Sequence, residues 1–386
     1  MLITRTIQKE LVDLMLHYPV VTITGPRQSG KTTLARMTYP DYHYCNLENP
    51  EIRNLAMEDP NAFFRQFRTP LIIDEIQRVP ALLSFIQGLV DERHDHGLYL
   101  LTGSQQFSMN EAITQSLAGR TALLTLLPLS MVELSDAGFV IDRDQIIHTG
   151  FLPGIYDKGL DPFKANRNYF QTYVERDLKQ LSHIRNLTNF ERFMRVLAGR
   201  IGQILNLSSI SNDLGVSSTT LSEWVSLLEA SFIVFRIYPY YENFGKRQIK
   251  SPKLYFSDTG LVSYLLGIET PEQVSRDPLI GNLFENLVVV EALKTRLNRG
   301  MDPAIYFFRD NNGNEVDIIY KKHQDLIPIE IKSAMTYQRK LAKGIEFFQR
   351  ITKKASNGYL IYAGEMHVSN STVEFINFKD TWKIFT

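Results

Sequence analysis

The feature that most constrains this chain is an eight-residue stretch that lies between an apolar run and a helical pattern. It reads Gly25-Pro26-Arg27-Gln28-Ser29-Gly30-Lys31-Thr32. Val20–Thr24 before it has the character of a buried strand, and the residues from 31 to about 38 that of a helix. Glycines let such a loop turn its N–H groups toward an anion, and the helix points its positive end at the same place. The pattern predicts a loop that binds phosphate groups.

The chemistry of ATP with Mg²⁺ suggests a role for each part of this loop. We expect Lys31 to contact the β- and γ-phosphates and Thr32 to hold Mg²⁺ through its hydroxyl group. The residues expected to bind the nucleotide are Gly25, Pro26, Arg27, Gln28, Ser29, Gly30, Lys31, Thr32 and Thr33, with Asp74 and Ser104 from later strands. The alternative is a chance match, against which the flanking strand and helix argue.

Two later apolar runs end in polar residues and complete the expected site. Leu71–Asp74 is a predicted strand that delivers Asp74, as a second Mg²⁺ ligand, and Glu75, as the base that polarises the attacking water. A third strand is predicted over 98–102. Ser104, or failing that Thr102, would sense the γ-phosphate, although a simple polar turn explains both equally well. Parallel α/β sheets place ligands at such carboxyl ends of strands.

Arg120, in Leu117-Ala118-Gly119-Arg120, is the candidate for an arginine that acts in trans. An ATPase of this kind gains from a cation at the transition state, and a neighbouring subunit can supply it. An ordinary surface arginine is the alternative.

Several motifs together resemble a prokaryotic family of AAA+-type ATPases. They are the loop at 25–32, Ile-Ile-Asp-Glu-Ile-Gln at 72–77, Leu-Thr-Gly-Ser at 101–104, Leu-Ala-Gly-Arg at 117–120 and Leu-Pro-Leu-Ser at 127–130. The likeness continues through 173–177 and 251–261, and so covers essentially the whole chain. It implies an AAA+-like core, homo-oligomers, and a C-terminal domain of a kind long labelled as of unknown function.

The middle of the chain reads as helix, turn, helix and strand. Ile210 and Leu214 form an apolar pair, Gly215 supplies a turn, and Phe232 begins an apolar strand. Residues 176–253 hold eleven Lys or Arg and six Asp or Glu, although the whole chain is neutral. The basic residues Lys246, Arg247, Lys250 and Lys253 follow the strand, where phosphate contacts are expected. We therefore predict a winged helix that contacts the DNA backbone; a structural lid or protein contact is the alternative.

A pattern of acidic residues near the end of the chain resembles the PD-(D/E)xK nuclease superfamily. Asp317 lies on one predicted strand, and Glu330 and Lys332 lie on the next. Glu285, on a predicted helix, supplies a third carboxylate. Glu285, Asp317 and Glu330 would hold a divalent metal ion, and Lys332 would position or deprotonate its water. A nuclease fold that grips DNA without cutting it is the alternative.

These interpretations combine into an α/β protein with an AAA+-like P-loop ATPase core over 1–150. A helical connector over 151–189, a winged-helix-like domain over 190–260 and a nuclease-like domain over 261–386 follow. The lone cysteine, Cys45, and the lack of a long apolar stretch favour a cytoplasmic protein without a membrane span. We expect an ATPase that acts on DNA, with branched or junction DNA as a candidate substrate. The alternative is an ATP-dependent switch whose last domain is a non-cleaving interaction module.

Overall fold

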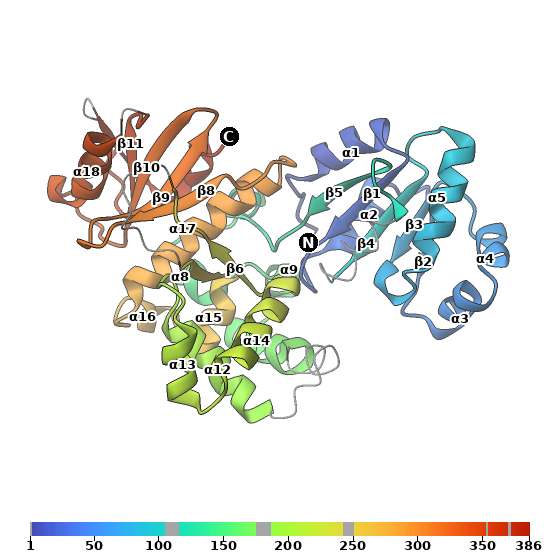
Figure 1. Ribbon diagram of the computed structural model, residues 1–386, viewed down its shortest axis with the longest axis horizontal. Coiled ribbons are helices and arrows are strands. Elements are labelled where there is room, and N and C mark those ends of the chain that lie inside the picture. Colours follow the sequence, from blue (N-terminus) through green and yellow to red (C-terminus); the bar gives the residue numbers. More distant parts are fainter. Residues whose placement is uncertain (1, 105–115, 175–186, 242–250, 353, 370–371) are drawn as a thin grey trace. The chain divides into compact units, whose positions relative to one another are not determined.

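The computed structural model describes residues 2–104, 116–174, 187–241, 251–352, 354–369 and 372–386 (Figure 1). The chain forms two compact units. The first comprises residues 1–129, 230–232 and 297–301, and the second comprises 130–229, 233–296 and 302–386.

The first unit is built on a five-stranded parallel sheet in the order β2-β3-β4-β1-β5. Its strands are β1 (Val20–Thr24), β2 (His43–Asn46), β3 (Leu71–Asp74), β4 (Tyr99–Gly103) and β5 (Thr121–Thr125). Its helices are α1 (Gln8–His17), α2 (Lys31–Thr38), α3 (Pro50–Glu58), α4 (Pro60–Gln66) and α5 (Leu82–Arg93), with a 3₁₀ turn at Ile76–Arg78.

Alternate residues of the central strands enter different cores. Val21 and Ile72 join the core that α1 and α2 cover, whereas Val20 and Ile73 join the core beneath α3, α4 and α5. Every residue of β1, β3 and β4 is buried, as expected for parallel strands with helices on both faces. The strands predicted at 20–24 and 71–74 and the helix predicted at 31–38 are confirmed.

The first part of the second unit is mostly helical. Its helices are α7 (Met131–Asp136), α8 (Arg143–Thr149), α9 (Pro153–Lys158), α10 (Pro162–Tyr169), a π-helical turn (Phe170–Val174), α12 (Leu187–Gly199), α13 (Leu207–Leu214), α14 (Ser218–Ala230), α15 (Thr259–Leu266) and α16 (Pro271–Val274). Two antiparallel strands, β6 (Val234–Ile237) and β7 (Lys253–Phe256), pair with each other. Gly215 ends α13 in a left-handed conformation, and Ser217 caps α14 by accepting the Thr220 N–H at 3.1 Å. The helix-turn-helix pattern read from the sequence is thus confirmed as two helices joined by a tight turn.

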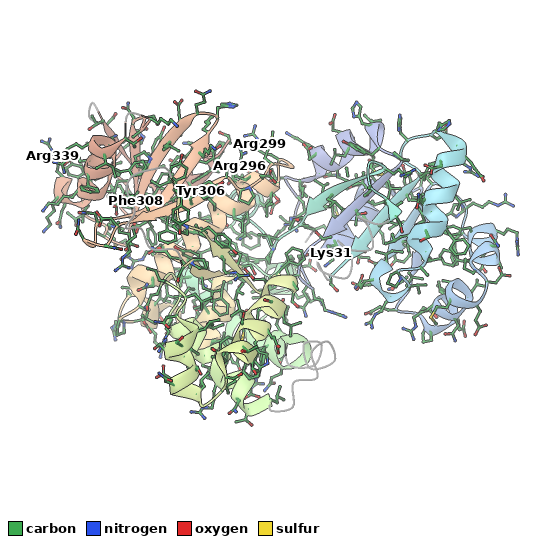
Figure 2. All side chains as sticks on the ribbon, viewed as in Figure 1. Lys31, Arg296, Arg299, Tyr306, Phe308 and Arg339 are labelled. Atoms are coloured by element: carbon green, nitrogen blue, oxygen red, sulfur yellow. The ribbon has the colours of Figure 1, made fainter. Side chains whose placement is uncertain are left out.

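The rest of the second unit is a mixed six-stranded sheet in the order β12-β13-β11-β10-β9-β8. Its elements are α17 (Ile280–Leu297), β8 (Ile305–Arg309), β9 (Glu315–Lys322), β10 (Asp325–Lys332), α18 (Lys343–Ile351), β11 (Gly358–Tyr362), β12 (Val368–Ser369) and β13 (Val373–Asn377), with 3₁₀ turns at Arg339–Ala342 and Phe378–Lys383. Strands β8, β9 and β10 are antiparallel, and the two strands predicted around Asp317 and Glu330 are confirmed as β9 and β10. Figure 2 shows Tyr306 and Phe308 on β8 of this sheet.

The N-terminal segment of the first compact unit extends to residue 129, and residues 130–150 belong to the second unit; the end of the ATPase core at residue 150 stays a prediction. Residues 130–150 join the second unit because α7 and α8 pack within it. Glu291 of α17 accepts the N–H of Met131 at 2.7 Å, and Ser263 of α15 donates to the carbonyl of Ile147 at 3.0 Å. The further division of the second unit into three domains stays a prediction. None of the described helices combines the length and the hydrophobicity that crossing a bilayer requires.

Candidate functional site

The loop after β1 has a backbone that requires glycine. Gly25 has a φ of 147° and Gly30 a φ of 94°, both unfavourable for residues with a side chain. A Cβ atom on Gly25 would lie 2.1 Å from the carbonyl oxygen of Leu126. Gly30 is the residue before α2, so the loop passes directly into the helix N-terminus. The predicted phosphate-binding geometry is therefore present between β1 and α2.

Lys31 lies buried at the first position of α2 (Figure 2). Its Nζ donates to the carbonyl oxygens of Gly25 at 3.0 Å and Pro26 at 2.7 Å. Burial lowers the pKa of the Lys31 ammonium to about 8, although Glu75 and Asp74 act in the opposite direction. The loop thus holds a desolvated cation beside its own carbonyl groups.

Arg5, which sequence reasoning missed, supports the loop from below. Its guanidinium is buried and donates to the carbonyl oxygens of Ser29 and Leu127, each at 2.7 Å. Arg5 therefore ties the phosphate-binding loop to the segment that follows β5. Nothing in the local sequence signals this contact, because Ser29 is 24 residues away and Leu127 is 122 residues away.

Asp74, at the end of β3, collects several hydroxyl groups. Both of its carboxylate oxygens accept the Thr32 hydroxyl at 3.0 Å, and one accepts the Tyr44 hydroxyl at 2.9 Å. The Thr102 hydroxyl also donates to Asp74. Tyr44 is a second residue that the sequence did not reveal, and burial followed by the Asp74 charge raises its pKa well above the usual range. Thr32 and Asp74 are thus brought together as predicted for a shared Mg²⁺ ion.

Glu75 adopts a left-handed backbone conformation, with a φ of 60°, that turns it away from the line of β3. Its carboxylate accepts the Ser104 hydroxyl at 3.2 Å and an N–H of the Gln77 amide. Gln77 also donates to Ser104 at 3.1 Å. The predicted base and the predicted sensor are therefore in direct contact, and Gln77 is an additional polar member of this group.

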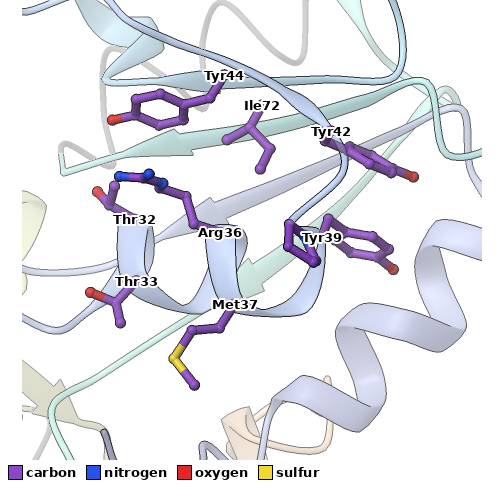
Figure 3. Close-up of a pocket in the computed structure, with 9 residues that line it drawn as sticks. Thr32, Thr33, Arg36, Met37, Tyr39, Tyr42, Tyr44 and Ile72 are labelled. Atoms are coloured by element: carbon purple, nitrogen blue, oxygen red, sulfur yellow. The ribbon is translucent and has the colours of Figure 1, made fainter.

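The remaining loop residues lie around the same position. Gln28 has a φ of 59°, and Arg27 contacts Glu48 at 3.5 Å. Thr33 and Thr32 line a pocket of about 500 Å³ along α2, together with Arg36, Met37, Tyr39, Pro40, Tyr42, Tyr44 and Ile72 (Figure 3). The guanidinium of Arg36 stacks over the Tyr44 ring, with 4.9 Å between its central carbon and the ring centre.

These residues fit a nucleoside triphosphate with Mg²⁺. The glycine cradle leaves no room for a Cβ, and Lys31 is a buried cation next to it. The Ser29 hydroxyl is buried and has no hydrogen-bond partner among the described residues. The hydroxyl of Thr32 and the carboxylate of Asp74 are oxygen donors of the kind that Mg²⁺ prefers.

Arg120 lies near the N-terminal ends of β1 and β5, whereas the loop follows the C-terminal end of β1. It comes immediately before β5, whose first residue, Thr121, pairs with Val20 at the start of β1. The guanidinium of Arg120 forms two hydrogen bonds with Asp91, at 2.5 and 2.8 Å. This position, at the end of β1 opposite the loop, is compatible with the predicted role in trans, which stays a prediction.

Asp317 and Glu330 lie on adjacent antiparallel strands, one step beyond the paired Ile318 and Ile329. Lys332 bridges them, with its Nζ 3.0 Å from Asp317 and 2.5 Å from Glu330. Burial and the charge of Asp317 raise the pKa of Glu330 to about 8. Burial would also raise the pKa of Asp317, but Lys332 and Lys253 outweigh it and hold that pKa below its usual value. One cation therefore serves two closely placed acids.

Glu285, the third carboxylate of the predicted metal centre, is engaged by a lysine and a tyrosine. Its Oε1 atom accepts from Lys253 Nζ at 2.9 Å and from the Tyr255 hydroxyl at 2.6 Å. The described residues contain no group of three or more His, Cys, Asp or Glu side chains arranged to hold a metal ion. Glu285, Asp317 and Glu330 are each paired with a lysine ammonium group, and their role as ligands of one metal ion stays a prediction.

The basic cluster predicted after β6 is also revised at one position. Lys253 is 2% exposed and faces carboxylates, so it is not placed for phosphate contacts. Lys246, Arg247 and Lys250 lie outside the described residues. Among the neighbouring aromatic residues, Tyr240 is buried and packs against Tyr306 with ring centres 5.7 Å apart.

Comparison with known proteins assigns three regions of the chain. An AAA domain matches residues 17–135, which include the whole phosphate-binding loop, Asp74 and Glu75. A domain of unknown function, DUF8612, matches residues 141–272, and another, DUF4143, matches residues 280–380.

Relatives extend over most of the chain. Protein Rv2008c of Mycobacterium tuberculosis is 31% identical over 322 residues, which are 82% of this chain and 71% of that protein. A protein of Haemophilus influenzae is 24% identical over 347 residues, 81% of this chain and 82% of its own length. A solved Walker-type ATPase of Pyrococcus abyssi aligns with 67% of this chain and 94% of its own, at 13% identity and a TM-score of 0.44. The chain therefore belongs to the same family as Rv2008c, and it carries an AAA domain and a DUF4143 domain.

Proposed function

We propose that the chain hydrolyses ATP with the help of Mg²⁺ at the loop between β1 and α2. The observation that carries this proposal is the direct contact between Thr32 and Asp74, 3.0 Å apart, beside a buried Lys31. Lys31 would neutralise charge on the β- and γ-phosphates, while Thr32 and Asp74 would hold the ion. When bound, Mg²⁺ supplies electrostatic stabilisation of the phosphate charge.

We assign the hydrolytic step to Glu75 and Ser104, and the contact between them supports this assignment. Glu75 would orient the attacking water, and its contact with Ser104 at 3.2 Å holds its carboxylate in place. The hydroxyl group of Ser104, directly after β4, can report whether the γ-phosphate is present. Arg120 would serve a neighbouring subunit of a homo-oligomer. Because a single cysteine cannot form a disulfide within the chain, we also propose a cytoplasmic setting.

We further propose that DNA is the polymer on which the ATPase acts. Support comes from the order of elements, in which α13 and α14 are followed by the antiparallel β6–β7 pair, as in a winged helix. The face of α14 that bears Ser218, Thr219 and Ser222 is exposed and carries hydroxyl groups. Such groups contact phosphate oxygens without reading bases, so backbone or shape recognition is expected, with branched DNA as one substrate to test.

The test is an ATPase assay of the full chain with linear, forked and four-way DNA, alongside Lys31→Ala. We expect DNA to raise the rate, and the stimulation to decline steeply as salt increases. Lys31→Ala should abolish hydrolysis on every substrate. A rate that no DNA changes would contradict the role of DNA and leave ATP hydrolysis intact.

A second candidate is an ATP-dependent switch whose DUF4143 domain is a non-cleaving interaction module. The observation that favours it is that the part of the chain that the structure describes contains no group of three or more His, Cys, Asp or Glu side chains arranged to hold a metal ion. A DNA-cleavage assay with Mg²⁺ or Mn²⁺ separates the candidates. Cleavage that Lys332→Ala and Asp317→Asn both abolish would support a nuclease, and the absence of cleavage would support the interaction module.

A further inference from the structure

Lys253, the first residue of β7, lies among acidic side chains that the ATPase proposal does not use. Its Nζ is 2.9 Å from Glu285 Oε1 and 2.6 Å from Glu315 Oε1. Glu285 comes from α17 and Glu315 from β9, so one ammonium group joins three elements. The ring of Phe307 lies on another side, with its centre 5.6 Å from the nitrogen.

The backbone holds this lysine in place from both sides. Lys253 pairs with Ile237 of β6 and forms a β-bridge with Ile204. The residue is 2% exposed, whereas the side chain of Lys332 is 33% exposed. Lys253 is therefore far more shielded from solvent than Lys332, and its backbone is fixed by pairing on both sides.

Glu285 does not fit the role of a metal ligand in this arrangement. Its Oε1 atom already accepts from both Lys253 and Tyr255, the latter at 2.6 Å. A divalent ion and the Lys253 ammonium would compete for the same carboxylates and repel each other. Glu285 and Glu315 are partly buried, with side chains 13% and 28% exposed, and Arg309 pairs with the other oxygen of Glu315 at 3.3 Å. The buried ammonium of Lys253 and the guanidinium of Arg309 thus compensate the two carboxylates from within the chain.

A pocket of about 430 Å³ gives solvent access to these groups. Glu285, Glu315 and Lys253 line it, together with Gly202, Gln203, Ile204, Asn282 and Arg309. A hydrated ion could therefore reach the carboxylates from outside. Because the pocket leaves the path open, access does not keep such an ion out. The positive charge of Lys253 is what opposes its binding.

We propose that Lys253 is the resident cation of this centre and stands where a divalent ion would otherwise lie between Glu285 and Glu315. The C-terminal acidic centre is then neutralised by the chain and needs no metal at Glu285. This inference rests on the geometry around Lys253 alone and is independent of what the ATPase acts on.

The test compares the nucleotide-free full chain with its Lys253→Met variant, with and without Mn²⁺. Removing the ammonium leaves Glu285 without its cation and Glu315 with Arg309 alone, so the Tm should fall by about 5 °C or more. Mn²⁺ should restore much of that loss in Lys253→Met, because the ion takes the place of the lost charge. It should leave the Tm of the unmodified chain unchanged, and the double variant Lys253→Met/Glu285→Gln should not recover.

Lys294→Met is the matched control, since Lys294 is also a buried lysine, bonded to Glu291 at 2.9 Å, but does not line the pocket. It should lose stability without recovery by Mn²⁺. Three results would overturn the proposal: an unaltered Tm in Lys253→Met, no recovery with Mn²⁺, or Mn²⁺ binding by the unmodified chain that Glu285→Gln removes. The last comparison, by titration calorimetry with MnCl₂, decides the matter if Lys253→Met does not fold; equal binding by both proteins supports the proposal.

Discussion

At the residue scale, the protonation of Lys31 links nucleotide binding to pH. Burial lowers the pKa of its ammonium to about 8 in the nucleotide-free chain. Phosphate groups favour the charged form, so the pKa of Lys31 should be higher in the complex. Between these two pKa values, the free chain has lost a proton that the complex retains.

We therefore predict that MgATP binding takes up a proton just above pH 8 and that affinity falls as the pH rises further. Calorimetry in buffers of different ionisation enthalpy measures this uptake. Lys31→Arg is the control, because arginine stays protonated and should abolish the buffer dependence. Identical heats in all buffers for the unmodified chain would contradict the prediction.

Arg5 acts on the same loop through hydrogen bonds to two carbonyl groups. Arg5→Ala removes both bonds and leaves the carbonyls of Ser29 and Leu127 without their donor. We expect the KM for ATP to rise about tenfold or more, since a buried charged hydrogen bond contributes roughly 1.5–3 kcal/mol. Steady-state kinetics checks this, and Arg5→Lys should recover part of the loss. An unchanged KM in Arg5→Ala would show that the loop holds itself.

At the element scale, helix α7 begins directly after the first unit ends and is capped in two ways. Ser130 accepts the Glu133 N–H at 3.2 Å, and Glu133 accepts the Ser130 N–H at 2.9 Å. Glu291 of α17 accepts the Met131 N–H at 2.7 Å. Three N-terminal N–H groups of a short helix are thus satisfied, which anchors the chain where it enters the second unit.

Ser130→Ala should lower the free energy of unfolding by about 1 kcal/mol, as expected for the loss of an N-cap. Urea unfolding followed by circular dichroism measures the change. Ser222→Ala, at an exposed position within α14, is the comparison and should have an effect near zero. Equal stabilities of the two variants would mean that the cap of α7 contributes nothing.

At the scale of the whole molecule, the position of Arg120 bears on assembly. It lies at the end of the strands opposite its own phosphate-binding loop, so the predicted catalytic role calls for a second copy of the chain. Its ion pair with Asp91 keeps the side chain exposed at the surface of the first unit. The Asp91 contact would have to yield when the neighbouring subunit binds.

We predict that Arg120→Ala lowers kcat while nucleotide affinity is preserved, and that mixing it with Lys31→Ala recovers part of the activity. At some interfaces of a mixed oligomer, an Arg120→Ala subunit would supply the intact loop and a Lys31→Ala subunit the intact arginine. ATPase assays on a mixing series test this. Two inactive variants that stay inactive together would argue against a role in trans, as would full activity of Arg120→Ala.

Local patterns were enough to predict many of the strands and helices and the main residues of the nucleotide site. The strands at 20–24 and 71–74 and the pair carrying Asp317 and Glu330 follow from apolar runs and turn residues close in sequence. Lys31, Thr32, Asp74 and Glu75 were predicted because the loop and the strand ends have characteristic short motifs. The contact between Glu75 and Ser104 also follows from neighbouring parallel strands.

The sequence by itself determined which elements form and which residues can bind phosphates, because glycine geometry, periodicity and charge are local properties. Only the tertiary structure decided that Arg5 and Tyr44 complete the nucleotide site and that Lys253 neutralises Glu285. These contacts join residues 24 to 32 positions apart and depend on strand register and helix packing. The folded chain thus places Lys253 beside Glu285, where the sequence pattern had suggested a metal ion.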